Sequence, residues 1–143
     1  MIRKVFIALF VAMAAGQLLS LGGFIDAVET YGVGGRIGAW LFAVSIVALE
    51  VGAVALLVGA SRRRLGATAT IATMTAWTAL AAQAFARGLV VPNCGCFGTF
   101  LSQELRWWVL VEDAYLLVLA SVMYRSLRSA RAGTEHRKIW QDA

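Results

Sequence analysis

Residues 37–60, IGAWLFAVSIVALEVGAVALLVGA, decide the fold of this 143-residue chain. The run is apolar apart from Ser45 and Glu50, and it exceeds the roughly 20 residues that an α-helix needs to cross a bilayer. Backbone groups in lipid have no water to bond, so a segment of this kind must satisfy them internally as a helix. The stretch therefore predicts a membrane-spanning helix.

Three further apolar runs, at residues 5–21, 65–86 and 105–124, are long enough for the same role. The chain is 60% hydrophobic and 15% charged, with a mean hydropathy of +0.75, whereas soluble domains are about 25% charged. Barrel strands are shorter and alternate in hydrophobicity. We therefore expect an all-α integral membrane four-helix bundle over residues 1–124, followed by a basic cytoplasmic tail at residues 125–143.

A short amphipathic helix is expected after the first membrane helix. Phe24, Ile25, Val28 and Tyr31 recur near helical spacing, with acidic residues turned elsewhere. A helix of this kind lies in the interface between lipid and water with its apolar face buried. It would cover the outer end of the bundle.

The basic residues indicate how the bundle is oriented. Most of them fall at the helix ends that also hold the two termini: Arg3, Lys4, Arg62, Arg63, Arg64, Arg125, Arg128, Arg131, Arg137 and Lys138. Only Arg36, Arg87 and Arg106 fall at the opposite ends. Cytoplasmic loops carry the excess of Lys and Arg, so both termini are predicted to be cytoplasmic in a plasma-membrane protein. The net charge of +5 then reflects topology and not nucleic-acid binding.

Residues 1–23 also resemble a secretory signal peptide, with two basic residues, an apolar stretch and then small residues. Removal of this segment would leave three membrane helices and break the charge symmetry. We therefore expect it to remain as the first helix.

Both cysteines lie one residue apart in Pro92-Asn93-Cys94-Gly95-Cys96-Phe97-Gly98, between the third and fourth membrane helices. The predicted orientation places them outside the cytoplasm, where disulfides form and persist. A disulfide between them closes a very small ring, for which the central glycine supplies backbone freedom. Such a bond would be strained and easily reduced, and it would constrain the unfolded chain little. A redox dithiol is therefore favoured over a structural disulfide.

A soft-metal site is the main alternative, since two thiolates can bind Cu(I) or Hg(II). No other Cys or Met stands near the cysteines in sequence, which counts against it. Zinc is disfavoured because the chain has one histidine, His136, and structural zinc sites take four ligands. A non-catalytic subunit of a larger membrane complex is a further alternative.

Charged residues near the cysteines and within the helices are candidates for supporting roles. Arg87 and Arg106 flank the cysteine segment, and positive charge or a helix N-terminus stabilises a reactive thiolate. Glu50, Glu112 and Asp113 are intramembrane acids, which normally face the bundle and have a partner. We expect Glu112 or Asp113 to meet Arg106 or Arg87. These acids either handle protons during thiol oxidation or hold helices together.

Polar side chains of the helices are interpreted first as packing. Threonine and glutamine can bond across helices, and candidates in the third helix are Thr68, Thr70, Thr73, Thr75, Thr78 and Gln83. Gln17 and Gln83 could instead touch a quinone head group, an idea that only their polarity supports. No cofactor is therefore assigned.

The motif Cys94-Gly95-Cys96-Phe97-Gly98, with Trp107 and an acid early in the last helix, resembles the MauE/DoxX group of redox-associated membrane proteins, and the MauE branch in particular. Glu50, followed by Gly52, resembles the acidic-glycine pattern of the group's second helix. Residues 24–31 resemble its short amphipathic segment. The resemblance extends to about residue 124, although the first helix lacks the basic residue that family members often carry.

The resemblance implies thiol–disulfide exchange outside the cytoplasm with a thioredoxin-like or disulfide-bearing protein. It implies that Cys94 and Cys96 form the redox pair and that Glu50 and Asp113 are the family's intramembrane acids. Asn93, Gly95 and Phe97 would support the pair. The sequence does not indicate which cysteine attacks.

Overall fold

The computed structural model describes residues 1–59 and 61–141, with side chains described as far as residue 129. These residues form five α-helices and no strand: α1 (Ile2–Leu19), α2 (Leu21–Glu29), α3 (Gly35–Val58), α4 (Arg63–Ala86) and α5 (Trp107–Gln141). Four of the helices, all except α2, are long and apolar enough to cross a membrane. The predicted all-α membrane bundle and its additional short helix are confirmed.

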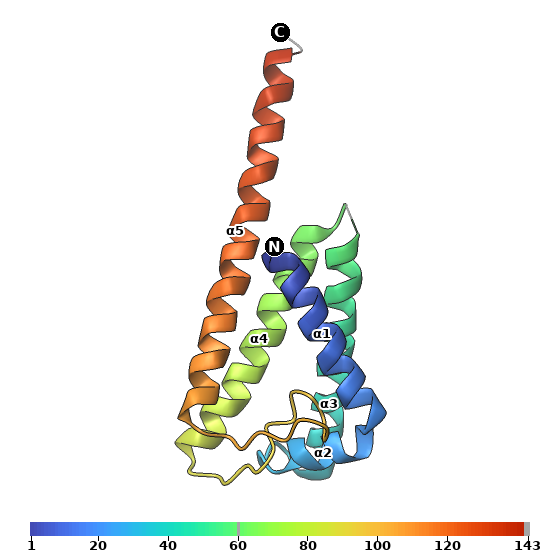
Figure 1. Cartoon of the computed structure of the whole chain (residues 1–143), viewed down its shortest axis with the longest axis vertical. Helices are drawn as coiled ribbons and strands as arrows, with labels where there is room; N and C mark the ends of the chain where they lie inside the picture. The colour runs from blue at the N-terminus through green and yellow to red at the C-terminus, as the bar shows by residue number, and fades with distance from the viewer. Residues whose placement is uncertain (60, 142–143) are drawn as a thin grey trace.

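The helix bounds follow the apolar runs to within about one turn, except at the end of the last helix. That helix does not stop near residue 124 but continues to Gln141. The segment predicted as a basic tail therefore begins as an extension of α5, which projects beyond the rest of the bundle (Figure 1).

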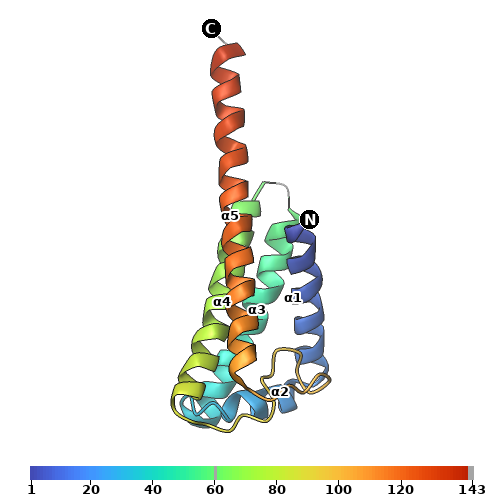
Figure 2. The same ribbon diagram turned by 60° about the vertical axis from the view of Figure 1, so that its left-hand side comes forward.

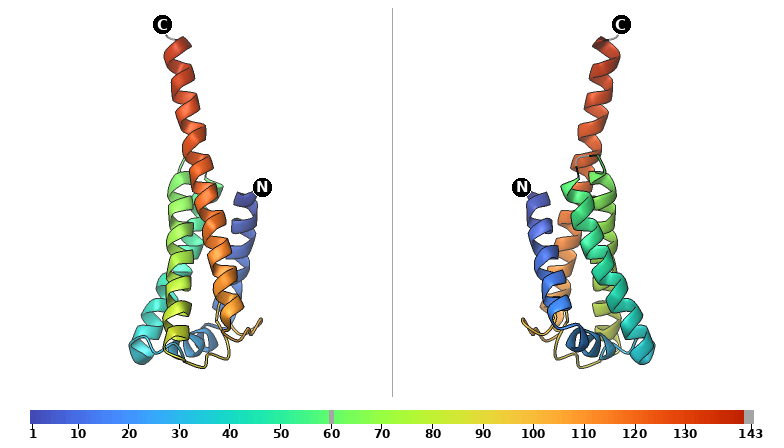
Figure 3. Two further views of the ribbon diagram at one scale, coloured as in Figure 1. Left: turned by 90° about the vertical axis from the view of Figure 1, so that its left-hand side faces the viewer. Right: turned by 90° about the vertical axis from the view of Figure 1, so that its right-hand side faces the viewer.

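The bundle is built around α3 and α4, which pack closely along one another. Helix α1 packs on α3 and α5 packs on α4, whereas α1 and α5 share few contacts. Helix α2 crosses the end of the bundle beside the segment at residues 87–106, and the two termini lie toward the other end (Figures 1 and 2). Figure 3 shows the same separation from both sides. The cysteine segment and the termini thus lie at opposite ends of the membrane helices.

Small residues allow α3 and α4 to approach closely. A Cβ added to Gly66 of α4 would lie 2.7 Å from the backbone nitrogen of Leu57 in α3. The α4 threonines were candidates for hydrogen bonds across helices, but they bond within α4. Each hydroxyl donates to the carbonyl four residues earlier in its own helix, as seen for Thr68, Thr70, Thr73, Thr75 and Thr78. Packing between these helices therefore depends on small, internally satisfied side chains.

Large apolar side chains also cover the outside of the helices. Exposed examples occur on every membrane helix, including Leu18, Leu41, Val51, Leu65, Phe85, Val111, Tyr115 and Val118. Helices that are apolar all round are suited to lipid contact and not to water. The chain is accordingly a multi-pass membrane protein.

Candidate functional site

The cysteines lie in a loop that folds back on itself between α4 and α5. The backbone N–H of Cys94 donates to the carbonyl of Gln103 over 2.7 Å, and that of Leu105 donates to Val91 over 2.9 Å. These bonds pair the outgoing and returning chain without forming a strand. They also bring Gln103 beside the first cysteine.

Asn93 sets the local turn geometry of the Cys-Gly-Cys motif. Its Oδ1 accepts from the backbone N–H of Gly95 over 3.0 Å, and its Nδ2 donates to the carbonyl of Gly98 over 2.9 Å. The N–H of Gly98 donates to the carbonyl of Gly95 over 2.9 Å, which closes a β-turn with Cys96 and Phe97 at its centre. Gly95 and Gly98 have φ of +82° and +64°, values that favour glycine.

This turn rests directly on α1 and α2. A Cβ added to Gly16 would lie 2.5 Å from the carbonyl oxygen of Phe97, and one added to Gly98 would collide with the carbonyl of Gly16. Gly95 lies over the ring of Phe24 in α2. The two backbones approach closely because glycine occupies both sides of the contact.

Two side chains from other elements hold the carbonyl groups of the cysteines. The hydroxyl of Tyr31, which follows α2, donates to the carbonyl of Cys94 over 2.9 Å. The amide of Gln17 in α1 donates to the carbonyl of Cys96, also over 2.9 Å. Tyr31 is itself fixed, because its own carbonyl accepts from Gln83 over 2.9 Å. The roles found for Gln17 and Gln83 agree with the packing interpretation.

Gln17 also connects the turn to the buried acid of α3. Its Nε2 donates to Glu50 Oε1 over 3.3 Å, and Trp77 Nε1 donates to the same oxygen over 3.2 Å. The Trp77 ring packs between Phe24 and Phe42, with centroid separations of 6.1 and 5.7 Å. Glu50 is fully buried, and within the described residues it forms no ion pair. Neutral donors alone therefore hold this carboxyl.

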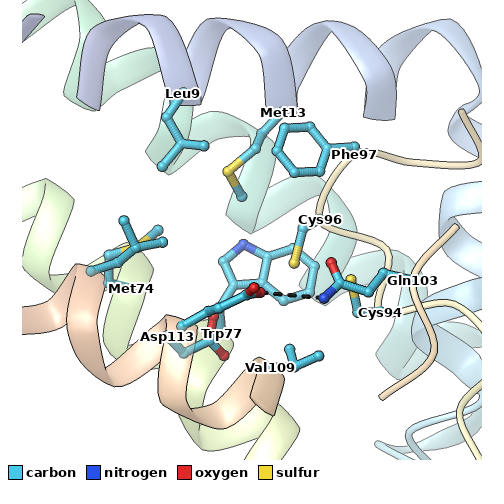
Figure 4. Close-up of a pocket in the computed structure, with 12 residues that line it drawn as sticks. Leu9, Met13, Met74, Trp77, Cys94, Cys96, Phe97, Gln103, Val109 and Asp113 are labelled. Atoms are coloured by element: carbon cyan, nitrogen blue, oxygen red, sulfur yellow. Dashed lines mark hydrogen bonds between the residues drawn. The ribbon is translucent and has the colours of Figure 1, made fainter. Parts of the chain in front are cut away.

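A cavity of about 70 Å³ lies beneath the turn, between α1, α4 and α5. It is lined by Leu9, Met13, Met74, Trp77, Cys94, Cys96, Phe97, Gln103, Val109, Glu112, Asp113 and Leu116. Cys94 is buried, whereas Cys96 is partly exposed and its sulfur points toward the space that the lining residues enclose (Figure 4). The thiols thus face a cavity inside the bundle.

The two thiols, both free, differ in acidity. A hydrogen bond from Cys96 lowers the pKa of Cys94 to about 7. The same hydrogen bond, together with burial, raises the pKa of Cys96 well above its ordinary value. Burial also raises the pKa of the Tyr31 phenol, so Tyr31 remains a proton donor to the turn. The pair therefore favours a single thiolate, shared with the neighbouring thiol.

The expected basic surroundings of the cysteines are not found. Arg106 forms an ion pair with Glu104 at 2.7 Å, and Arg87 donates to Gln83 over 3.1 Å. In the described part of the chain, neither guanidinium bonds to the cysteines or to the acids of α5. Instead, Glu112 accepts from Gln103 over 3.3 Å, and Asp113 lines the cavity with both thiols. The expectation that Arg106 or Arg87 would pair with one of these acids is wrong.

Several residues of the site were not assigned to it from sequence. Tyr31 was predicted only as part of the amphipathic segment, and Trp77 and Gln103 were not singled out. Their amino-acid types give no signal, because aromatic and amide side chains in a membrane helix or loop are most often packing. The sequence offers one signal, the adjacent Gly16 and Gln17 in an apolar helix. The glycine permits a close approach of another segment, and the glutamine can donate a hydrogen bond to it.

Metal-binding side chains of the usual kinds do not cluster here. The residues that the structure describes contain no group of three or more His, Cys, Asp and Glu side chains able to hold a metal ion. However, Met13 and Met74 line the same cavity as the cysteines. The sequence suggested that no other sulfur lies near the cysteines, but in the folded chain two methionines line the same cavity.

Comparison with known families gives one result. The family model described as methylamine utilisation protein MauE matches residues 1–126. This range covers α1 to α4, the whole cysteine loop and α5 as far as residue 126. Neither the curated proteins nor the solved structures contain a significant match to the chain.

Proposed function

We propose that this chain, which belongs to the MauE family of membrane proteins, carries out thiol–disulfide exchange through Cys94 and Cys96. Membership of that family supports a place in a redox-related pathway. The observation that carries the proposal is the pairing of the two thiols. They line one cavity, in a turn whose two cysteine carbonyls are each held by a side chain from elsewhere in the bundle. Such a turn holds two free thiols at one site, where we expect them to form one bond.

The exchange begins with the more acidic thiol. The Cys94 thiolate attacks one sulfur of a partner's disulfide, an S–S bond forms between the two proteins, and the partner's second sulfur leaves as a thiolate. Cys96 then attacks the sulfur of Cys94, which releases the partner and leaves the Cys94–Cys96 disulfide. Two electrons pass to the partner, and the two protons lost by the cysteines balance its two new thiols. The reverse sequence oxidises the partner.

The acids and the turn residues support this reaction. Asp113 shares the cavity with both thiols, so its carboxylate can take up a thiol proton while the second S–S bond forms. Glu50 acts indirectly, because Gln17 donates hydrogen bonds both to Glu50 and to the carbonyl of Cys96. Asn93, Gly95 and Phe97 hold the geometry of the turn.

The partner in this proposal is an extracytoplasmic thioredoxin-like or disulfide-bearing protein, met at the surface of the plasma membrane. The cysteine loop lies at the end of the bundle opposite the termini (Figure 1), and the excess of basic residues near the termini supports an extracytoplasmic loop. Because Cys94 is buried, the loop at residues 91–105 must shift for a protein disulfide to reach its sulfur.

The test is to trap the mixed disulfide in native membranes. Cys94→Ser and Cys96→Ser variants are separated on non-reducing gels, and any adduct is identified by mass spectrometry. We expect Cys96→Ser to accumulate a reducible adduct, because Cys94 can attack but nothing resolves the product. The double Cys→Ser variant is the matched control. If neither single variant forms an adduct and the double variant keeps full function in cells, the proposal is wrong.

A further inference from the structure

The cavity beneath the turn gathers much of the sulfur in the protein. The chain has two cysteines and four methionines. Both cysteines and two of the methionines, Met13 and Met74, line this one cavity. Thiol–disulfide exchange has no use for thioether groups, so the methionines raise a separate question.

The position of Met13 on α1 directs it toward the cysteines. Residues three and four positions apart share a helix face, so Met13 lies on the same face as Gly16 and Gln17. Gly16 contacts the backbone of Phe97, and Gln17 donates to the carbonyl of Cys96. In Figure 4 the Met13 side chain extends from α1 into the space that Cys96 also faces.

The cavity lacks the positive charge that would suit a free thiolate pair. Its charged lining residues are both acidic, Glu112 and Asp113, and no Lys or Arg lines it. The two arginines that flank the cysteine segment in sequence bond elsewhere, Arg106 to Glu104 and Arg87 to Gln83. A site built only to stabilise a thiolate would be expected to have positive neighbours. A bound cation would supply positive charge here and offset part of the charge that two thiolates carry.

We infer that this cavity binds a soft monovalent metal ion of the Cu(I) class, coordinated by the thiolates of Cys94 and Cys96 and by the thioether of Met13. Soft thiolate and thioether ligands select Cu(I), whereas Mg²⁺ and Ca²⁺ take oxygen ligands. Binding releases to solvent the protons that the two thiols still carry, and it changes no oxidation state. The cavity, at about 70 Å³, has room for an ion, and methionine has the rotatable bonds to adjust around it.

This inference requires reduced cysteines but does not rest on thiol exchange, so the two can be tested apart. Purified, reduced protein in detergent is titrated anaerobically with Cu(I) against bicinchoninate, a coloured Cu(I) chelator. We expect one Cu(I) per chain. Met13→Leu, which nearly conserves volume, should weaken binding about tenfold or more, the scale on which a metal site responds to loss of a supporting group.

Matched variants make the result specific. Met123→Leu changes a buried methionine that does not line this cavity and should leave the affinity unchanged. Cys96→Ser should abolish retention of Cu(I) against the chelator, and Zn(II) should not be retained by any variant. Exchange with a trapped partner should survive in Met13→Leu.

Two results would overturn the inference. One is failure of the wild-type protein, with both thiols shown to be free, to retain Cu(I) against the chelator. The other is X-ray absorption of the Cu(I)-loaded wild-type protein that reports two sulfur ligands and not three, a measurement that needs no variant to fold.

Discussion

Gln17 Nε2 donates to the carbonyl oxygen of Cys96 over 2.9 Å, although the two residues are 79 positions apart in the sequence. The same nitrogen donates to Glu50 Oε1 over 3.3 Å. One fully buried amide therefore joins α1, α3 and the cysteine turn. Water does not reach this position freely, so no other donor replaces the amide when it is removed.

Gln17→Leu is expected to destabilise the fold and loosen the turn. Loss of a donor to buried groups costs about 1–3 kcal/mol when the acceptors stay unsatisfied. Thermal unfolding in detergent should shift to lower temperature, and Cys96 should be labelled faster by a maleimide. Thr75→Val is the control, because this exposed hydroxyl bonds only within its own helix and its loss should change stability by less than about 0.5 kcal/mol. Equal effects of the two variants would contradict the role of Gln17.

Gly16→Ala and Gly52→Ala form a matched pair of helical glycine substitutions. A Cβ at Gly16 would lie 2.5 Å from the carbonyl oxygen of Phe97, whereas a Cβ at Gly52 meets nothing within 4 Å. Overpacking at Gly16 should cost about 1–3 kcal/mol, and alanine at Gly52 should be neutral or stabilise the helix by up to about 1 kcal/mol.

Two quantities are measured for each variant. One is the midpoint of thermal unfolding in detergent, and the other is the fraction of Cys96 that a maleimide labels in a fixed time. Gly16→Ala should increase labelling, because the turn is displaced from α1. Identical midpoints and identical labelling would show that the turn does not depend on this close contact.

The sequence was sufficient for the helices and for a candidate site at the cysteine motif, but not for the contacts of that site. Long apolar runs predict membrane helices because lipid leaves the backbone no alternative, and the cysteine motif stands out within them. Tyr31 and Gln17 reach the motif across 63 and 79 residues. Hydropathy and periodicity carry no information about partners so distant in the chain.

The sequence did not predict the hydrogen-bond partners of the two arginines or the methionine beside the cysteines. Arg106 was expected to pair with an acid of α5 but bonds Glu104, two residues away, and Arg87 bonds Gln83, four residues away on the same helix end. A pair that is close in sequence loses less conformational entropy on forming than a pair that closes a long loop. Met13 is 81 positions from Cys94 in the sequence and was not singled out, and only the approach of α1, α4 and α5 places both on one cavity.

Glu50 is expected to be required as a hydrogen-bond acceptor. Its Oε1 accepts from Trp77 and from Gln17, and glutamine can supply the same carbonyl oxygen. Glu50→Gln should therefore keep the unfolding midpoint close to that of the wild type, whereas Glu50→Leu should lower stability by about 1–3 kcal/mol because two buried donors lose their acceptor. Trp77 fluorescence reports the local change. A Glu50→Gln variant as unstable as Glu50→Leu would show that the charge, and not the acceptor, is required.

The orientation of the bundle can be checked by reporters at its two ends. The basic residues predict cytoplasmic termini, so a fluorescent protein fused after residue 143 should fluoresce, and an alkaline phosphatase fused there should be inactive. A phosphatase fused within residues 87–106 should be active. The opposite pattern would place the cysteines in the reducing cytoplasm and remove the setting on which thiol–disulfide exchange depends.

The hydrogen bond from Cys96 should make Cys94 reactive at neutral pH. Only the thiolate reacts, so alkylation of Cys94 by iodoacetamide should rise with pH and reach half its maximal rate near the pKa of about 7. An unperturbed cysteine, with a pKa of about 8.5, is only a few per cent thiolate at that pH. Because Cys94 is buried, the pH midpoint is the informative quantity and not the absolute rate.

Cys96→Ala removes the donor and should move the midpoint of Cys94 upward, toward the ordinary value. Mass spectrometry of the peptide after timed alkylation resolves the two cysteines, and a midpoint that is the same in both proteins would mean that Cys96 does not activate Cys94.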